Sequence, residues 1–274
     1  MKTLKILQRG LCAALLLGLG GSAGAQIVTS QHDLTVGGGG QGSTANTTEV
    51  CVFCHTPHGA VTGAPVPLWN KVLPSTSYTR YSSLNLVSFD STEAPVGSVS
   101  LACLSCHDGT QAMDVVVNSP GSGGYNPAGS EIDPVAIGVM TGIPVPTLGS
   151  DLTDDHPISM QYGGGGATDA DADGTFAGIL GDPDFTPPEK ATINSSPIWW
   201  IDSPGDGGSG GNANVREKQD MLLYSRDDLG AVQPFVECAS CHDPHNSSTA
   251  GPTSVAFLRI PNTDSQICTS CHLK

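Results

Sequence analysis

The sequence CASCHDPH, at residues 238–245, contains two cysteines separated by two residues and a histidine directly after the second. The same Cys-x-x-Cys-His pattern occurs as CVFCH at 51–55, CLSCH at 103–107 and CTSCH at 268–272. We number these motifs I to IV in chain order, so that CASCH is motif III. They contain every cysteine after residue 25, namely Cys51, Cys54, Cys103, Cys106, Cys238, Cys241, Cys268 and Cys271.

The histidine at the fifth position of each motif identifies the chemistry. Disulfides, zinc and haem compete for cysteine pairs in an exported protein, but neither disulfides nor a zinc ribbon requires a histidine after every pair. Cys-x-x-Cys-His is the attachment signature of haem c. Two thioether bonds fix the porphyrin edge to one turn of chain, and the next imidazole reaches the iron. We expect four haem c groups, with these proximal ligands: His55, His107, His242 and His272.

The remaining histidines match the number of second axial positions. They are His32, His58, His156 and His245. This count predicts that two imidazoles ligate every iron. Met113 and Met160 are the alternative ligands, although packing is their expected role.

Two of these candidates, His58 and His245, follow a proximal histidine by three residues. That span is at most about 11 Å, and Pro57 and Pro244 stiffen it. We therefore expect each to ligate a neighbouring haem rather than the haem of its own motif.

Residues 1–25 have the pattern of a removable signal peptide. Lys2, Lys5 and Arg9 give a basic start, residues 11–20 form an apolar run, and residues 23–25 form a small-residue cleavage site. The run is short for a membrane anchor, which is the alternative. We expect a secreted protein at the cell surface or outside the cell, with the periplasm as the alternative.

The charge of the mature chain is strongly negative. Removal of the signal leaves 8 of the 11 basic residues against 26 acidic ones, a formal charge of −18. This balance argues against a nucleic-acid partner. Two readings of this acidity are equally good: it only keeps a secreted protein soluble, or it has a specific role in docking.

The composition predicts little regular structure. The chain has 35 glycines and 20 prolines but only 5% aromatic residues, so the polypeptide alone would form a poor core. We expect a mostly irregular, loop-rich fold, with short helices at the motifs and a few short strands, built around a stack of four haems. A single domain, 26–274, would contain a flexible arm (26–48), a first haem pair (49–118), a loop-rich insert (119–230) and a second haem pair (231–274).

Local patterns predict where helices begin. Thr47 is placed to cap a turn before motif I. Residues 263–266, TDSQ, have the pattern of a capping box before motif IV. The stretch 212–228 contains neither glycine nor proline and is the candidate for one helix in the insert.

An acidic loop in the insert suggests calcium. Asp169, Asp171 and Asp173, followed by Gly174, occupy positions 1, 3, 5 and 6 of a calcium-loop pattern. Position 12 is Leu180 where a bidentate glutamate is expected. A solvated acidic loop is therefore the alternative to a calcium site that borrows Asp182 or Asp184.

Several segments resemble the extracellular multihaem cytochromes that polymerise into conductive filaments, of the tetrahaem OmcE type. They are HDL at 32–34, EVCVFCHTPHGA at 49–60, PLWNK at 67–71, ACLSCHDGT at 102–110, DDHPIS at 154–159, CASCHDPH at 238–245 and CTSCH at 268–272. The resemblance implies bis-histidine haems in a closely spaced chain, with one axial histidine supplied by the adjacent subunit. His32, on the N-terminal arm, is the candidate for that ligand. An arm that folds back within its own chain is the equal alternative.

The expected function is electron transfer rather than catalysis. A homo-polymeric filament would carry electrons from a redox donor at the periplasm or outer membrane to an extracellular acceptor. A soluble periplasmic shuttle has the same chemistry and differs in assembly. A multihaem oxyanion reductase is the other alternative, and it needs an iron with an open position, which the histidine count does not leave.

Overall fold

The computed structural model describes residues 27–40, 46–86, 91–132, 137–141, 147–166, 181–203, 216–246 and 257–273. Its helices are α2 (Ser98–His107), α3 (Cys238–Cys241) and α4 (Gln266–Cys271), with short 3-10 turns at η1 (Tyr81–Leu84), η2 (Pro120–Ser122), η3 (Tyr162–Gly164) and η4 (Thr263–Ser265). This loop-rich architecture with short helices and strands agrees with the expectation from composition. Within the described ranges no helix has the length and apolar character needed to cross a membrane.

One antiparallel sheet of five strands organises the C-terminal half. Its order is β3-β7-β6-β5-β4, and its strands are β3 (Met160–Gln161), β4 (Glu189–Ile193), β5 (Ser196–Ile201), β6 (Met221–Arg226) and β7 (Gln233–Val236). Trp199 and Trp200 are adjacent in β5 and both are 1% exposed. Because successive strand residues point to opposite faces, the sheet is covered on both sides at this point.

The insert is therefore more ordered than its glycine and proline content indicates. It was expected to hold scattered strands, but β3, β4, β5 and β6 join with β7 into one sheet. The predicted helix at 212–228 is wrong where the structure describes this stretch. Met221, Leu222, Leu223 and Tyr224 form β6 instead, because their apolar side chains are consecutive rather than repeated at helical spacing.

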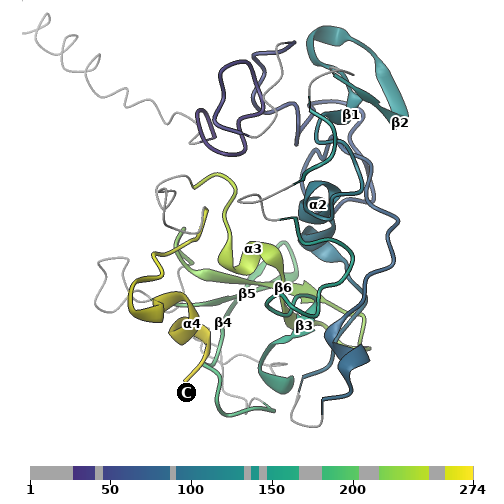
Figure 1. The fold of residues 1–274 in the computed structure, drawn as a ribbon. Coiled ribbons are helices and arrows are strands. Elements are labelled where there is room, and N and C mark those ends of the chain that lie inside the picture. The colour runs from purple at the N-terminus through teal and green to yellow at the C-terminus, as the bar shows by residue number, and fades with distance from the viewer. Residues whose placement is uncertain are drawn as a thin grey trace, which may run out of the picture.

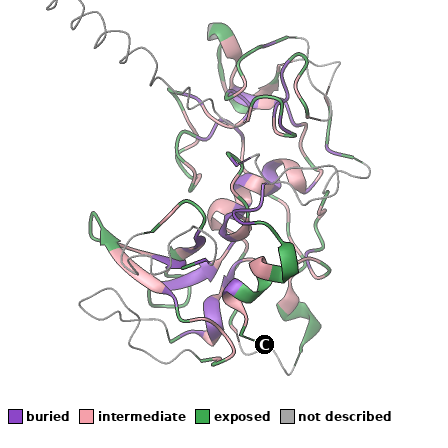
Figure 2. Cartoon of the chain, turned by 90° about the vertical axis from the view of Figure 1, so that its left-hand side faces the viewer, coloured by how far each residue is buried: buried purple, intermediate pink, exposed green. Residues whose placement is uncertain are grey.

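A second, smaller unit lies at the other end of the molecule. β1 (Val115–Asn118) pairs antiparallel with β2 (Tyr125–Glu131). Figure 1 shows this hairpin at one end, α2 in the middle and the five-stranded sheet at the other end. In Figure 2 the buried residues gather in the sheet and around α2, while the outer loops are exposed.

Each of these two regions has its own apolar cluster. The sheet cluster contains Tyr162, Trp199, Ile201, Met221, Leu223 and Ile260, and Cys271 packs against it. The hairpin cluster contains Leu34, Val52, Phe53, Met113 and Met140, and Cys54 and Cys106 pack against it. One cysteine of each of motifs I, II and IV therefore lies at the surface of a core.

The helix caps differ in part from the sequence prediction. Thr47 Oγ1 accepts a hydrogen bond from the Glu49 amide at 3.0 Å, as a cap would. The predicted capping box before motif IV is wrong, because residues 263–265 form η4 and no side chain caps α4. A capping box is instead present at the start of α3, between Glu237 and Ser240.

Candidate functional site

Every Cys-x-x-Cys-His motif forms one helical turn. The amide of the fifth-position histidine donates to the carbonyl of the first cysteine in motif I (2.8 Å), motif III (3.1 Å) and motif IV (2.9 Å). Motif II occupies the last turn of α2. This turn brings both cysteines and the histidine to one side of the backbone, which is the arrangement that haem attachment requires.

The cysteines show neither of the competing chemistries. All eight motif cysteines are free thiols, so they form no disulfide framework. Among the residues that the structure describes, the one group of three or more ligand-type side chains close enough to share a metal is Asp202, Glu217 and Asp220. The cysteine pairs therefore do not come together as a zinc ribbon would require.

In three pairs of histidines, the two imidazole rings of the pair lie opposite each other at nearly the same centroid separation. The ring centroids of His32 and His107 are 6.2 Å apart, those of His55 and His245 are 6.1 Å apart, and those of His156 and His272 are 6.5 Å apart. A metal bonded to a ring nitrogen at about 2 Å lies about 3 Å from the ring centroid, so two imidazoles on opposite sides of one iron have centroids about 6 Å apart. Each pair contains one motif histidine and one of the four other histidines.

Both imidazoles of the His55–His245 pair have a neighbouring acceptor at Nδ1. His55 Nδ1 lies 2.8 Å from the Pro67 carbonyl, and His245 Nδ1 lies 3.5 Å from an Asp243 carboxylate oxygen. The hydrogen bond with His245 is the main cause that lowers the pKa of Asp243 to about 2. Hydrogen bonding at Nδ1 leaves Nε2 for a metal, as in many metal-binding histidines.

His156 is held in a similar way, and His32 is held by packing. His156 Nδ1 lies 3.1 Å from the Pro157 carbonyl. The His32 ring stacks on Phe257, with centroids 4.1 Å apart. Burial and the neighbouring His107 lower the pKa of His32 to about 4, so this imidazole is neutral at neutral pH. Its Nδ1 is buried and has no hydrogen-bond partner among the described residues, which fits a nitrogen that binds a metal.

The N-terminal segment that carries His32 is folded where the structure describes it. The Asp33 carboxylate accepts hydrogen bonds from the amides of Thr29 (2.7 Å) and Thr35 (3.1 Å). A Cβ on Gly38 would lie only 2.2 Å from the Asp33 carbonyl, so this turn requires glycine at that position. These contacts place His32 beside His107 of its own chain.

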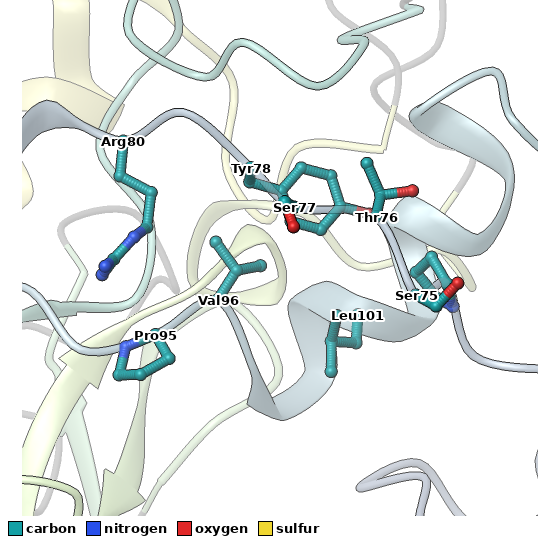
Figure 3. A pocket seen from close by; sticks show the side chains of 9 residues that line it. Ser75, Thr76, Ser77, Tyr78, Arg80, Pro95, Val96 and Leu101 are labelled. Carbon is teal, nitrogen blue, oxygen red and sulfur yellow. The ribbon is translucent and has the colours of Figure 1, made fainter. Parts of the chain in front are cut away.

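His58 is not in any of the three pairs, and it is exposed. It lines a cavity of about 740 Å³ together with Cys51, His55 and Tyr125. This volume is in the range of cofactor sites, and the cavity opens beside motif I. A second cavity, of about 360 Å³, has walls that include Tyr78, Val96 and Leu101 (Figure 3). Its lining residues include no cysteine or histidine, so it offers no group for haem attachment.

Cysteines of consecutive motifs lie close to one another. Burial and, after it, nearby Cys106 of motif II raise the pKa of Cys54, in motif I, to about 12. Cys103, in motif II, shares a side-chain hydrogen bond with Cys238 in motif III, and this bond raises its pKa. Cys241, in motif III, contributes to the raised pKa of Cys271, in motif IV, so these two motifs also lie close together.

The alternative ligands take structural positions. Met113 and Met160 are both buried, and Met113 belongs to the hairpin cluster. The acidic residues Asp169, Asp171 and Asp173 lie outside the described residues, so the calcium site stays a prediction. Asp182 and Asp184 are described, and the Asp184 amide donates to the Asp182 carboxylate at 2.9 Å.

Sequence reasoning did not find the residues that orient the imidazoles. Trp69 packs edge-on to His55 with ring centroids 6.2 Å apart, and Phe185 lies 4.5 Å from His272 by the same measure. Phe257 is the partner of His32, and Asp243 is that of His245. Asp243 and Trp69 had a signal in the sequence, because they lie within the CHDPH and PLWNK segments.

The comparisons with known proteins agree with this geometry. The family model of the doubled CXXCH motif matches residues 233–274, which include motifs III and IV. The match supports a multihaem cytochrome c. In such a cytochrome the CXXCH motifs indicate covalently bound haem c and support electron transfer. A search of curated proteins gives no match to the chain.

The matched segment of this multihaem cytochrome joins its two cores. It begins in β7, which belongs to the five-stranded sheet, and contains α3, which packs against α2. It also contains His245, which faces His55 of motif I, and it ends in α4. The doubled motif thus packs against α2, which carries motif II, and brings His245 opposite His55 of motif I.

Proposed function

We propose that this multihaem cytochrome is an electron carrier with four haem c groups, each ligated by two histidines, and that it assembles into an extracellular filament. The observation that carries the proposal is the set of three histidine pairs with ring centroids 6.1 to 6.5 Å apart. Each proposed pair spans distant parts of the chain, so this spacing is a property of the tertiary fold.

The proposed roles of the residues follow from their positions. The cysteine pair of each motif would hold a haem edge, and each of the three close histidine pairs would supply both axial ligands of one iron. A bound haem supplies a metal that exchanges single electrons between its ferric and ferrous forms. Two imidazoles on each iron leave no position for an oxyanion substrate, which favours a carrier over a reductase.

The order of the motifs supports a continuous path. Neighbouring motifs place cysteines close enough to shift one another's pKa, from motif I to motif IV. Since these cysteines would hold the edges of the haems, the edges of haems bound at consecutive motifs would lie near one another. Electrons would then pass from haem to haem in the order of the sequence.

Absorption spectroscopy of the purified protein tests the carrier function. Carbon monoxide added to the reduced protein binds any iron that has an open or weakly held position. A spectrum that does not change supports the carrier. Prompt formation of a carbon monoxide adduct in the wild-type protein would contradict it and favour the reductase.

The fourth histidine pair carries the proposal of assembly. The three close pairs leave His58 and His242 for the fourth iron, and His58 lies on the surface beside the motif I cavity. In our proposal His58 of one subunit ligates the motif III haem of the next subunit. This role replaces the one expected for His32, which lies beside His107 of its own chain.

Electron microscopy of secreted material tests this assembly. We expect filaments from the wild type and from H32A, and only monomers from H58A. Filaments from H58A would contradict the role of His58. A wild-type protein that stays monomeric would favour the soluble shuttle.

A further inference from the structure

Phe257 packs against the face of the His32 imidazole. The two rings are stacked, with centroids 4.1 Å apart and planes inclined by 14°. Phe257 is 6% exposed, so this contact lies in the protein interior. A ring that covers one face of an imidazole hinders rotation of that imidazole about a bond to a metal. The stack therefore fixes the plane of His32.

A hydrogen bond holds the edge of the same imidazole. The Pro244 carbonyl accepts this bond, which opposes the lowering of the His32 pKa by burial. Nδ1 has no partner among the described residues, so this nitrogen remains for an iron. Ligating histidines commonly donate their other ring N–H to a backbone carbonyl, and that bond fixes the orientation of the ring. Phe257 and Pro244 thus hold His32 from its face and from its edge.

The backbone that carries Phe257 is bonded to the end of motif III. The Phe257 carbonyl accepts a hydrogen bond from the Asp243 amide at 2.8 Å. Two residues later, the Arg259 amide donates to the Cys241 carbonyl at 2.9 Å. Because these bonds join residues 257–259 to motif III, Phe257 has a fixed position beside that motif.

The backbone of Phe257 is strained, and the contact of its ring with His32 gives the strain a purpose. Its φ is +64°, in the left-handed region that a bulky aromatic residue rarely adopts. A glycine would adopt this conformation freely, whereas a phenylalanine stays in it only when the surrounding contacts hold it there. What the phenylalanine adds at this position is the ring that stacks on the imidazole.

The fixed plane of His32 is nearly perpendicular to that of the facing imidazole. The rings of His32 and His107 are inclined by 81°, whereas those of His55 and His245 are inclined by only 17°. The orientation of the axial ligands affects the electronic structure of a low-spin ferric haem. Nearly parallel planes give a rhombic electron paramagnetic resonance signal, and steeply inclined planes give a signal at much larger g values. The inclination can therefore be measured in the holoprotein.

We propose that Phe257 is a positioning residue for the haem of motif II, and that it holds the His32 imidazole perpendicular to that of His107. The inference rests on the proposed function, because it requires that these two histidines ligate one iron. It adds that a segment bonded to motif III sets the electronic structure of the haem at motif II. The competing reading is that Phe257 only fills space, in which case a leucine would preserve the angle.

Electron paramagnetic resonance of the oxidised, purified holoprotein tests this role. H32A assigns the signal, because the haem that loses this imidazole also loses its low-spin signal. In the wild type, the signal so assigned should lie at large g. In F257L it should move to smaller g and broaden, because the His32 ring is free to turn. F257Y keeps an aromatic ring and should retain the wild-type signal. F257M replaces F257L if F257L does not fold.

F235L is the matched control for the loss of an aromatic ring from the interior. Phe235 is fully buried in β7, where its ring centroid lies 5.2 Å from the Arg226 guanidinium carbon. Both leucine variants should lower the melting temperature, because both lose buried apolar contacts. Only F257L should shift the His32 signal, so a general loss of packing is separated from the loss of the stack.

The outcomes separate the inference from the proposed function. A low-spin F257L protein with the wild-type His32 signal overturns the role of Phe257, as does an equal shift in F235L or F257Y. A wild-type His32 signal at small g overturns it as well. Conversion of this haem to high-spin in F257L alone supports the role, since His32 has then left the iron. If H32A removes no low-spin signal, the His32–His107 ligation is contradicted instead.

Discussion

The imidazole rings of His55 and His245 lie nearly parallel, at 17°, with centroids 6.1 Å apart. His55 belongs to motif I, and His245 comes three residues after motif III. One iron held by both would therefore connect the two halves of the chain. His245 thus lies opposite the histidine of a motif other than its own, as ligation of another motif's haem would require, and that ligation stays a prediction. The arrangement also explains why the span from His242 to His245 can be short and stiff.

Replacing His245 with alanine should open one iron of the four. We expect about a quarter of the haem in H245A to become high-spin and to bind carbon monoxide, because the motif I iron loses its second imidazole. Absorption spectra before and after addition of carbon monoxide measure this fraction. D243N is the matched control: it removes the carboxylate beside His245 but keeps the ligand, so its haems should stay low-spin. A fully low-spin H245A protein would contradict the proposed pair.

The buried ion pair between Arg226 and Glu237 should stabilise the contact between α2 and α3. The two side chains are 8% and 0% exposed, and their charged atoms are 2.9 Å apart. Glu237 also accepts a hydrogen bond from Ser100 in α2 at 2.5 Å. In R226M the carboxylate would remain buried without a counter-charge, which costs about 3 to 5 kcal/mol. Denaturant unfolding measured by circular dichroism tests this loss, and a change below about 1 kcal/mol would contradict it.

The same variant should show a distinct pH dependence. Burial raises the pKa of Glu237, so its contribution to stability is greatest at low pH and declines as the pH rises through the folded-state value. Without Arg226 the ionised carboxylate becomes still less favourable. The difference in melting temperature between wild type and R226M should therefore be larger at neutral than at mildly acidic pH. R226K keeps the positive charge beside Glu237, so it should behave like the wild type in both conditions.

Removal of calcium should leave the protein unchanged. The acidic loop at 169–174 has Leu180 where a calcium loop needs a bidentate glutamate, so we expect the solvated loop rather than a tight site. Melting curves with and without a chelator should coincide. A melting temperature that falls on chelation and recovers on addition of calcium would establish the site instead.

The local parts of the site could be predicted from the sequence, because they depend on spacing alone. The motifs specify their helical turns, and the histidine count indicates the set of candidate ligands. The pairing of His32 with His107 could not be predicted in the same way, because it depends on the fold of residues 27–40 around Asp33 and on the position of Phe257. These contacts join segments that are distant in the sequence.

The sheet illustrates the same limit. A high content of glycine and proline correctly indicated a loop-rich chain, but it concealed the apolar runs at Trp199 and Leu223 that pair in neighbouring strands. The run at 221–224 lacks helical periodicity, and that observation favoured a strand more than the absence of glycine and proline favoured a helix. The burial of Lys71 could not be predicted in this way either, because its ammonium group donates hydrogen bonds to carbonyls of residues 112–115, which come after motif II.

Intact-protein mass spectrometry of the purified, denatured protein tests the central claim most directly. Our account predicts a mature chain that retains the mass of four haem groups, because thioether bonds survive denaturation. A chain with fewer than four covalently attached haems would contradict it.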